Sequence, residues 1–348
     1  MILQHSQFNQ LLQSFPIAKF DFSNPQHLDE LNQNSLQSIV NNIGQLPLLP
    51  PFEKHPYLCP LDPNDKHTGL MIGTFPPITY LTTSLNLPQL SYQMQKFTAP
   101  QIDYFHGNYS SLWKYAPLQF DIIQQAPRYI QPSLLEAALS NARITYTDIV
   151  KYTQRTLNTS GKYDAGDANL FSIIPHVEVF DYLWNAETIN RIYFTNASFY
   201  SASSNFFSSN GKLNHNHKDA FSLFVRTAWF LGIDIAYSFY TPGSTWIPLN
   251  ENQKTSSERR QINNDLSSKV VMKIKLSKNE KEKVFIICSS VSPAAVNRGT
   301  YRNPCVRAYA TLYQQNPEAT VQTTNDFIRF VLQHFFSNNC GLLQSLNC

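Results

Sequence analysis

The sequence predicts an α/β protein built around a parallel β-sheet that is covered by helices on both faces. Three short apolar runs have the composition of strands buried on both faces. They cover residues 69–74, 190–196 and 283–290. Segments with helical periodicity lie between and after these runs. They cover residues 132–142, 219–233 and 324–336. Such alternation is typical of a doubly covered parallel sheet, which binds ligands at the carboxyl ends of its strands.

Local residues mark the ends of these elements. The first run, GLMIGT, contains Gly73 and is followed by two prolines, which is typical of a buried strand that closes in a tight loop. The first helix has Pro132 in its first turn, where a proline costs no hydrogen bond. Gly232 lies near the end of the second helix, and Asn325 is a candidate N-cap of the closing helix.

The N-terminal region stands outside this pattern. Residues 1–65 are interpreted as an accessory segment, and residues 66–348 as the main domain. Helical periodicity predicts a helix at 25–42. The proline-rich run that follows it predicts an extended tether, because proline has no backbone donor and fixes its own φ angle.

A charged insertion near residues 251–283 also departs from the pattern. Its first part, 251–269, is polar and is expected to form a mobile excursion. Its second part alternates between apolar and polar residues, as a strand does. Lys273 and Lys275 would then lie on one face of a hairpin arm.

Composition narrows the classes of function without selecting one. The chain has 348 residues, a formal net charge of +3 and 42% hydrophobic residues, which allows a sizeable core. No run approaches the roughly 18 apolar residues of a membrane span. The N-terminus lacks the features of a signal peptide, so we expect a cytoplasmic protein with no membrane partner.

The residues that commonly bind metals do not form a recognisable site. The five cysteines are scattered and include no CxxC pair, which argues against disulfides, a zinc site or an iron–sulfur cluster. His215 and His217 form a pair, but no further ligands stand at suitable spacing. We therefore expect no metal.

Two motifs could form the wall of a site for a flat heterocycle. The run GTFPP at 73–77 follows the first strand, where small and rigid residues would bring backbone groups and one ring beside a ligand. The run DYFHGNYSSLWK at 103–114 is rich in aromatic rings. Stacking on an unpaired base is worth roughly 1–3 kcal/mol. An ordinary strand exit and a packed aromatic corner are the structural alternatives.

Two further motifs carry hydroxyl and carboxyl groups. The run ITYTDIV at 144–150 contains Asp148 and is followed by an arginine and an acidic stretch. The run CSSVSPAA at 288–295 follows the third strand. Hydroxyls and free backbone amides at a strand end can bind a phosphate or an anionic leaving base. Serine-rich turns also occur as plain turns, so neither motif decides the function alone.

Taken in order, the four motifs resemble those of the uracil-DNA glycosylase superfamily. The first and last are most similar to the branch of the deoxyinosine (hypoxanthine) glycosylases and their bacterial relatives. The resemblance spans about residues 68–340 and is specific only in the motifs. It implies a three-layer α/β/α fold with a central, mostly parallel four-stranded sheet. It also implies a monofunctional DNA N-glycosylase, with DNA as its partner and without a cofactor.

The resemblance implies roles for individual residues. Phe75 and one aromatic of the second motif would enclose the flipped base, and backbone amides near Thr74 would face its edge. The aromatic candidates are Tyr104, Phe105 and His106. Residues beside the strand ends would hold the flipped nucleotide, its phosphate and the neighbouring duplex. They are Pro76, Pro77, Ser290, Ser292, Pro293, Asn297, Arg298 and Arg302.

The residue that orients the attacking water stays open between candidates. Several related branches have Asp, Glu or Asn in the first motif, where this chain has Thr and Phe. Asn108 is the first candidate and Asp148 the second, while Ser111 stands where the deoxyinosine branch has an asparagine. Asp148 could equally cap a helix that runs through Lys151. Ser292 would act on the leaving group.

Other functions compete with removal of a deaminated base in DNA repair. The long N-terminal segment and the charged insertion would suit an enlarged pocket for a bulky modified base of phage DNA, as an antiviral defence. The missing acidic or amide group in the first motif would suit a catalytically weak module that captures a flipped base without excising it. An unrelated α/β hydrolase has no support, because the chain lacks GxSxG and a phosphate-binding glycine loop.

Overall fold

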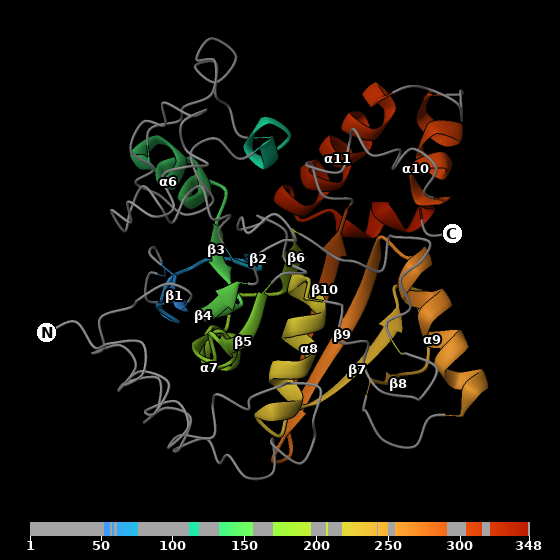
Figure 1. Ribbon diagram of the computed structural model, residues 1–348. Coiled ribbons are helices and arrows are strands. Elements are labelled where there is room, and N and C mark those ends of the chain that lie inside the picture. The colour runs from blue at the N-terminus through green and yellow to red at the C-terminus, as the bar shows by residue number, and fades with distance from the viewer. Residues whose placement is uncertain are drawn as a thin grey trace, which may run out of the picture.

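The computed structural model is an α/β fold with one large and one small β-sheet (Figure 1). The described residues are 52–55, 58, 61–75, 111–117, 132–155, 170–195, 207, 218–241, 243–249, 255–290, 304–314 and 321–346. The predicted helix at 25–42 and the histidine pair at 215 and 217 lie outside them.

The large sheet has seven strands rather than the four expected. In spatial order they are β3 (Ile144–Asp148), β2 (Gly69–Gly73), β6 (Arg191–Phe194), β10 (Lys281–Ser289), β9 (Val271–Lys278), β7 (Asp234–Phe239) and β8 (Ile247–Pro248). The first four are parallel to one another. The last three add antiparallel pairs, so the sheet is mixed.

One of the three extra strands, β9, arises from the region expected to be an insertion, whereas β7 and β8 precede that region. Asn279 and Glu280 join β9 to β10, and both have positive φ angles, 49° and 64°, as a tight hairpin turn requires. The hairpin arm predicted there is therefore confirmed. The stretch expected to be a mobile excursion instead forms helix α9 (Ser256–Ser268). Thr255 and Glu258 form a capping box that fixes its start.

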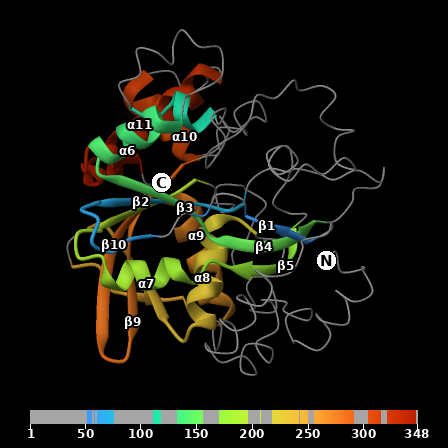
Figure 2. The same cartoon turned by 90° about the vertical axis from the view of Figure 1, so that its left-hand side faces the viewer.

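Helices cover both faces of the parallel strands. Phe194 on β6 contacts Phe221 and Phe224 of α8 (Ala220–Phe230), whereas the preceding residue, Tyr193, contacts Phe335 of α11 (Val321–Phe336). Because consecutive strand residues point to opposite faces, α8 and α11 lie on opposite sides of the sheet. Figure 2 shows α6 (Pro132–Asn141), α10 (Pro304–Tyr309) and α11 on one side, and α7 (Glu178–Asn185) and α8 on the other.

Short helical turns complete the described elements. They are the 3₁₀ helices η3 (Ser111–Lys114) and η9 (Cys340–Leu346) and the π-helix η8 (Ala310–Gln314), which continues α10. Arg191 on β6 is fully buried and donates hydrogen bonds to the backbone oxygens of Phe335 and Phe336. These carbonyls end α11 and have no partner within the helix, so the guanidinium anchors the helix to the sheet.

The small sheet grows out of the carboxyl end of β3. It contains β1 (Phe52–Lys54), β4 (Val150–Arg155) and β5 (Leu170–Pro175), in the order β1-β4-β5 and all antiparallel. Only Ile149 separates β3 from β4, and its amide donates to the Gly73 carbonyl of β2. The helix that Asp148 was expected to cap is therefore absent, because the chain after it continues as a strand.

Within the described residues, the three strands and three helices predicted by apolar periodicity are confirmed within a few residues of their predicted ends. One cap was wrong. The closing helix begins at Val321, so Asn325 lies inside it, where its side chain accepts a hydrogen bond from the Tyr115 hydroxyl. No described helix is long and apolar enough to cross a membrane.

Candidate functional site

Four parallel strands end side by side at one edge of the large sheet. β3 ends at Asp148, β2 at Gly73, β6 at Phe194 and β10 at Ser289. Asp148 pairs with Gly73, and Ser289 pairs with Phe194, so the ends are nearly level. Three strand spacings separate β3 from β10, which makes this edge about 14 Å wide. We call it the carboxyl edge.

Asp148 is the buried carboxylate of the carboxyl edge. Its side chain is 1% exposed. Nε2 of His55 donates to its Oδ2 over 2.8 Å, and the Tyr146 hydroxyl lies 3.4 Å from its Oδ1. The ring of Tyr146 in turn contacts Trp113 of η3, edge to face, with ring centroids 5.9 Å apart. A buried carboxylate needs such donors, because burial without them is very costly.

His55 reaches Asp148 from the N-terminal region. β1 pairs with β4, and the His55 amide donates to the Lys151 carbonyl over 2.8 Å, which extends the pairing by one residue. The imidazole also lies at right angles to the ring of Phe75, with centroids 5.4 Å apart. His55 therefore contacts two predicted site residues that come from different motifs.

Thr74 and Phe75 continue β2 beyond its last residue. The Thr74 carbonyl accepts a hydrogen bond from the Val150 amide, so this stretch is held as a strand extension. Phe75 is buried against His55 on the face that carries Asp148. The Thr74 hydroxyl and the indole nitrogen of Trp113 are also buried, and neither has a hydrogen-bond partner among the described residues. Unpaired buried donors are rare in native proteins, and a bound water, a bound ion or a functional role can account for them.

Ser290 lies at the far end of the carboxyl edge, directly after β10. Its hydroxyl is 2.7 Å from the hydroxyl of Tyr193, which is wholly buried on the neighbouring strand β6. Burial raises the pKa of Tyr193 far above its ordinary value, so the phenol stays protonated and can donate to Ser290. The start of the last motif is therefore held rigidly.

A second buried histidine supports β3 from the opposite face. Nδ1 of His176 is 3.1 Å from the Thr147 hydroxyl and 3.2 Å from the Asp148 carbonyl, so this nitrogen carries the proton. Burial lowers the pKa of His176 to about 4, which keeps the imidazole neutral near pH 7. Through Nδ1, the histidine contacts the Thr147 hydroxyl and the Asp148 carbonyl, so it fixes the end of β3.

The neighbours of His176 are charged. Its Nε2 is 3.6 Å from Oε2 of Glu178, whose other oxygen is bound by the ammonium group of Lys151. Burial alone would raise the pKa of Glu178, but the charge of His176 once it is protonated, and the ammonium group of Lys151, hold it below its ordinary value. Glu178 is therefore ionised and pairs with Lys151.

Four of the predicted site residues have described side chains, namely Thr74, Phe75, Asp148 and Ser290, and all four lie at the carboxyl edge. Ser111 begins η3, two residues from Trp113, but its side chain is outside the description. The remaining candidates also lie outside the described residues. They are Pro76, Pro77, Tyr104, Phe105, His106, Asn108, Ser292, Pro293, Asn297, Arg298 and Arg302.

Sequence reasoning missed His55 and Tyr193. His55 follows a segment without apolar periodicity, and only its pairing with β4 brings it to Asp148. Tyr193 lies in the middle of an apolar run, where a tyrosine is indistinguishable from an ordinary core residue. In each case the hydrogen bond joins residues that are more than ninety positions apart in the chain.

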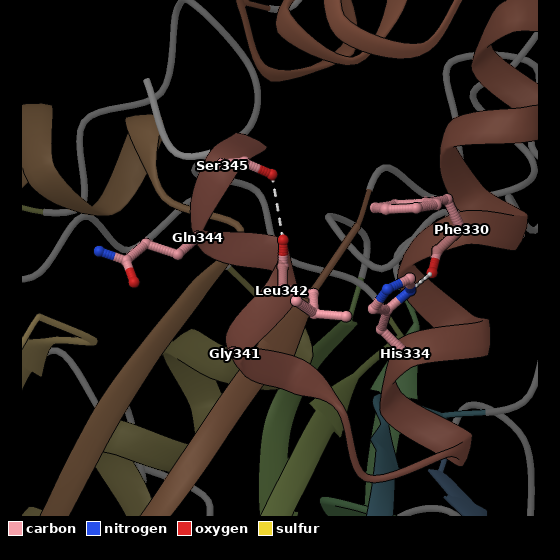
Figure 3. Close-up of a pocket in the computed structure, with 6 residues that line it drawn as sticks. All are labelled: Phe330, His334, Gly341, Leu342, Gln344 and Ser345. Atoms are coloured by element: carbon pink, nitrogen blue, oxygen red, sulfur yellow. Dashed lines mark hydrogen bonds between the residues drawn. The ribbon is translucent and has the colours of Figure 1, made fainter.

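An open hollow of about 650 Å³ lies elsewhere, between α11 and η9 (Figure 3). It is lined by Phe330, His334, Gly341, Leu342, Gln344 and Ser345. Figure 3 shows the His334 imidazole turned back onto its own helix, where Nδ1 donates to the Phe330 carbonyl over 2.9 Å. The hollow includes none of the predicted site residues, and the Ser345 hydroxyl donates to the Leu342 carbonyl within η9.

The described residues contain no group of three or more His, Cys, Asp or Glu side chains that could hold a metal ion. A scan of protein-family models, a search of curated proteins and a search of solved structures found no match to the chain. The geometry of the carboxyl edge and the four sequence motifs are therefore the basis for assigning a function.

Proposed function

We propose that the protein is a monofunctional DNA glycosylase, which flips a modified or deaminated base out of DNA and hydrolyses its bond to the sugar. One observation carries the proposal. Residues of three motifs, Phe75, Asp148 and Ser290, lie at the ends of neighbouring parallel strands, although more than two hundred positions separate the first from the last. Ligands bind parallel sheets at this edge.

The strand order gives further support. In chain order the parallel strands are β2, β3, β6 and β10, and in space they follow the order β3-β2-β6-β10. The chain therefore reverses direction across the sheet beside β2, and such a switch point is where α/β sheets bind ligands. GTFPP begins at this point. The four parallel strands within this mixed sheet are compatible with the parallel core that the resemblance to uracil-DNA glycosylases implies.

Asp148 is the group in the described residues best suited to orient the attacking water. In the reaction, the water oxygen forms a bond to the sugar carbon while the bond to the base breaks, and the base leaves with the electron pair. The water proton passes to solvent or to the departing base. A buried carboxylate can accept a hydrogen bond from the water and can stabilise the positive charge that develops on the sugar. Asn108 is the other candidate.

The remaining groups match the parts of a flipped nucleotide. Phe75 offers an aromatic ring for stacking beside the carboxylate, and the unpaired donors of Thr74 and Trp113 can bind acceptors on the base. Ser290, about 14 Å along the edge, can hold the phosphate. Flipping costs a few kcal/mol, which these contacts must offset.

A base-release assay tests the proposal. Duplexes that carry a single uracil, hypoxanthine, xanthine or glucosylated hydroxymethylcytosine are incubated with the full chain, and the free base is separated and quantified. We expect release from at least one of them. Release of the glucosylated base alone would assign the protein to defence against modified phage DNA. Absence of release from all four, with the protein folded, would contradict the proposal.

The competing function is capture of a flipped base without hydrolysis. Its support is the first motif, in which Thr74 and Phe75 replace the acidic or amide residue of several related branches. Affinity and release are therefore measured on the same oligonucleotide. Tight binding that prefers the modified base, without any release, would favour the binding module over the enzyme.

A further inference from the structure

We propose that His55 is a positioning residue for the reaction, which makes the N-terminal region part of the catalytic machinery. This inference rests on the proposed function and assigns to the site a residue that lies outside its four motifs. His55 directly follows β1, and the hydrogen bond from its amide to the Lys151 carbonyl of β4 fixes its backbone. Its imidazole would hold the carboxylate that orients the water.

The hydrogen bond between His55 and Asp148 has the geometry that such a role needs. It measures 2.8 Å from Nε2 to Oδ2, and both side chains are 1% exposed or less. Because the acceptor is a carboxylate, Nε2 must carry the proton. Hydrogen bonds to charged groups are roughly twice as strong as neutral ones, so this contact selects one orientation of the carboxylate.

The other oxygen of Asp148 has a longer contact. The Tyr146 hydroxyl lies 3.4 Å from Oδ1, at the long end of hydrogen-bond geometry. The short bond to His55 therefore fixes one carboxylate oxygen closely, and the proposed role of His55 is to set the orientation of the whole carboxylate towards the reacting water.

His55 also fixes the ring that would stack on the base. The imidazole and the Phe75 ring meet at 88° with centroids 5.4 Å apart, which is a favourable edge-to-face contact. One side chain thus sets the position of the carboxylate relative to the stacking ring. A misplacement of such groups by 1 Å can lower a rate by about 10²-fold.

The groups around this pair come from every neighbouring element. Tyr146 lies on β3, and His176, which follows β5, contacts the Asp148 carbonyl rather than the carboxylate. Glu178 and Lys151 form their own ion pair beside His176. Nε2 of His55 makes the short, buried bond to the Asp148 carboxylate. Loss of His55 would remove this bond from a buried carboxylate.

The test uses the full chain with His55→Leu, which has no donor, and His55→Gln, which keeps an N–H donor. On the duplex that the wild type processes fastest, we expect His55→Leu to lower kcat by about 10²-fold, a larger change than that in KM for DNA. The acidic limb of its pH–rate profile should move to higher pH, because the charged carboxylate loses a short hydrogen bond. His55→Gln should recover most of kcat and the original limb.

The matched control is His67→Gln. His67 precedes β2 at the opposite edge of the sheet, and its Nδ1 lies 3.7 Å from the Asp65 carboxylate. Its substitution should leave kcat and the pH–rate profile unchanged. Unfolding midpoints are measured for all variants, so that rates are compared per folded molecule. Wild-type kcat and an unmoved acidic limb in folded His55→Leu would overturn the inference.

A second readout separates this inference from the proposed function. Carbon NMR of the Asp148 carboxyl group, assigned with Asp148→Asn, follows its titration without any substrate. We expect the titration midpoint to move to higher pH in His55→Leu and to stay near the wild-type value in His55→Gln. Absence of base release by the wild type would contradict the proposed function. An unchanged titration midpoint of Asp148 in His55→Leu would contradict the role of His55.

Discussion

The carboxyl edge of the parallel half and the hairpin of the antiparallel half hold their polar side chains differently. At the carboxyl edge, Thr74, Asp148 and Ser290 are buried. In the hairpin, Lys275 of β9 forms an ion pair with the exposed Glu282 of β10. Buried polar groups cost free energy unless they are bound, whereas surface pairs cost little and add little. This contrast supports the proposal that the functional site lies at the carboxyl edge.

The antiparallel half does have regular interactions of another kind. Lys273 lies over the Tyr240 ring and Lys275 over the Trp246 ring, each with its ammonium group 5.4 Å from the ring centre. Such contacts stabilise a surface without requiring a ligand. Substitutions in the parallel half should change base release or stability, whereas substitutions of the hairpin ion pair in the antiparallel half should not.

Asp148→Asn should have the largest effect. The amide has the same shape as the carboxylate but cannot carry its charge, so we expect base release to fall by roughly 10²–10⁴-fold. Single-turnover release from the preferred duplex measures this, with the unfolding midpoint as the control for folding. A wild-type rate would exclude Asp148 as the group that orients the water and leave that role to Asn108.

His176→Gln should change how stability depends on pH. The folded-state pKa of His176, about 4, is below the ordinary value of 6.5, so the unfolded chain binds the proton first as the pH falls. The neutral histidine therefore supports the fold fully above about pH 6.5, and this support is lost as the pH falls towards 4. The difference corresponds to roughly 3 kcal/mol.

Urea unfolding of the wild type and of His176→Gln, at steps from pH 7 to pH 4, measures this effect. The wild type should lose stability across the window, and the variant should lose clearly less. Glu178 does not obscure the result, because its own pKa is lowered and its contribution is lost only below its ordinary value of 4.5. Equal slopes in the two proteins would refute a buried neutral His176.

Tyr193→Phe should have a moderate effect. It removes the hydroxyl that contacts Ser290 and keeps the ring against Phe335, so we expect a loss of about 1 kcal/mol in unfolding free energy. If Ser290 holds the phosphate, KM for DNA should rise as well. Tyr237→Phe is the control, because its hydroxyl binds Asp265 in the antiparallel half of the sheet. A rise in KM with both variants would argue against a specific role of Ser290.

Lys275→Gln and Glu282→Gln should have the smallest effect. Their ion pair measures 2.9 Å, but the carboxylate is fully exposed and screened by water. We expect no measurable change in base release and no resolved change in the urea midpoint. A clear loss of DNA affinity in Lys275→Gln alone would extend the functional surface into the antiparallel half.

Apolar periodicity predicted most of the fold, since buried strands and amphipathic helices follow from local patterns. It predicted neither the number of strands nor the small sheet. β1 and β4 are short and mixed in composition, and their pairing is a long-range choice that no local pattern encodes. The same limit explains why Asp148 could be proposed as a helix cap. Its identity was visible in the sequence, but the strand that follows it was not.

The proposed function requires that the carboxyl edge hydrolyse the bond between base and sugar. Mass spectrometry of a modified duplex after a single turnover detects both products of this hydrolysis. We predict one free base for each abasic site, with both DNA strands intact and with no metal or cofactor added. A duplex of unchanged mass, bound tightly to folded protein, would contradict the claim.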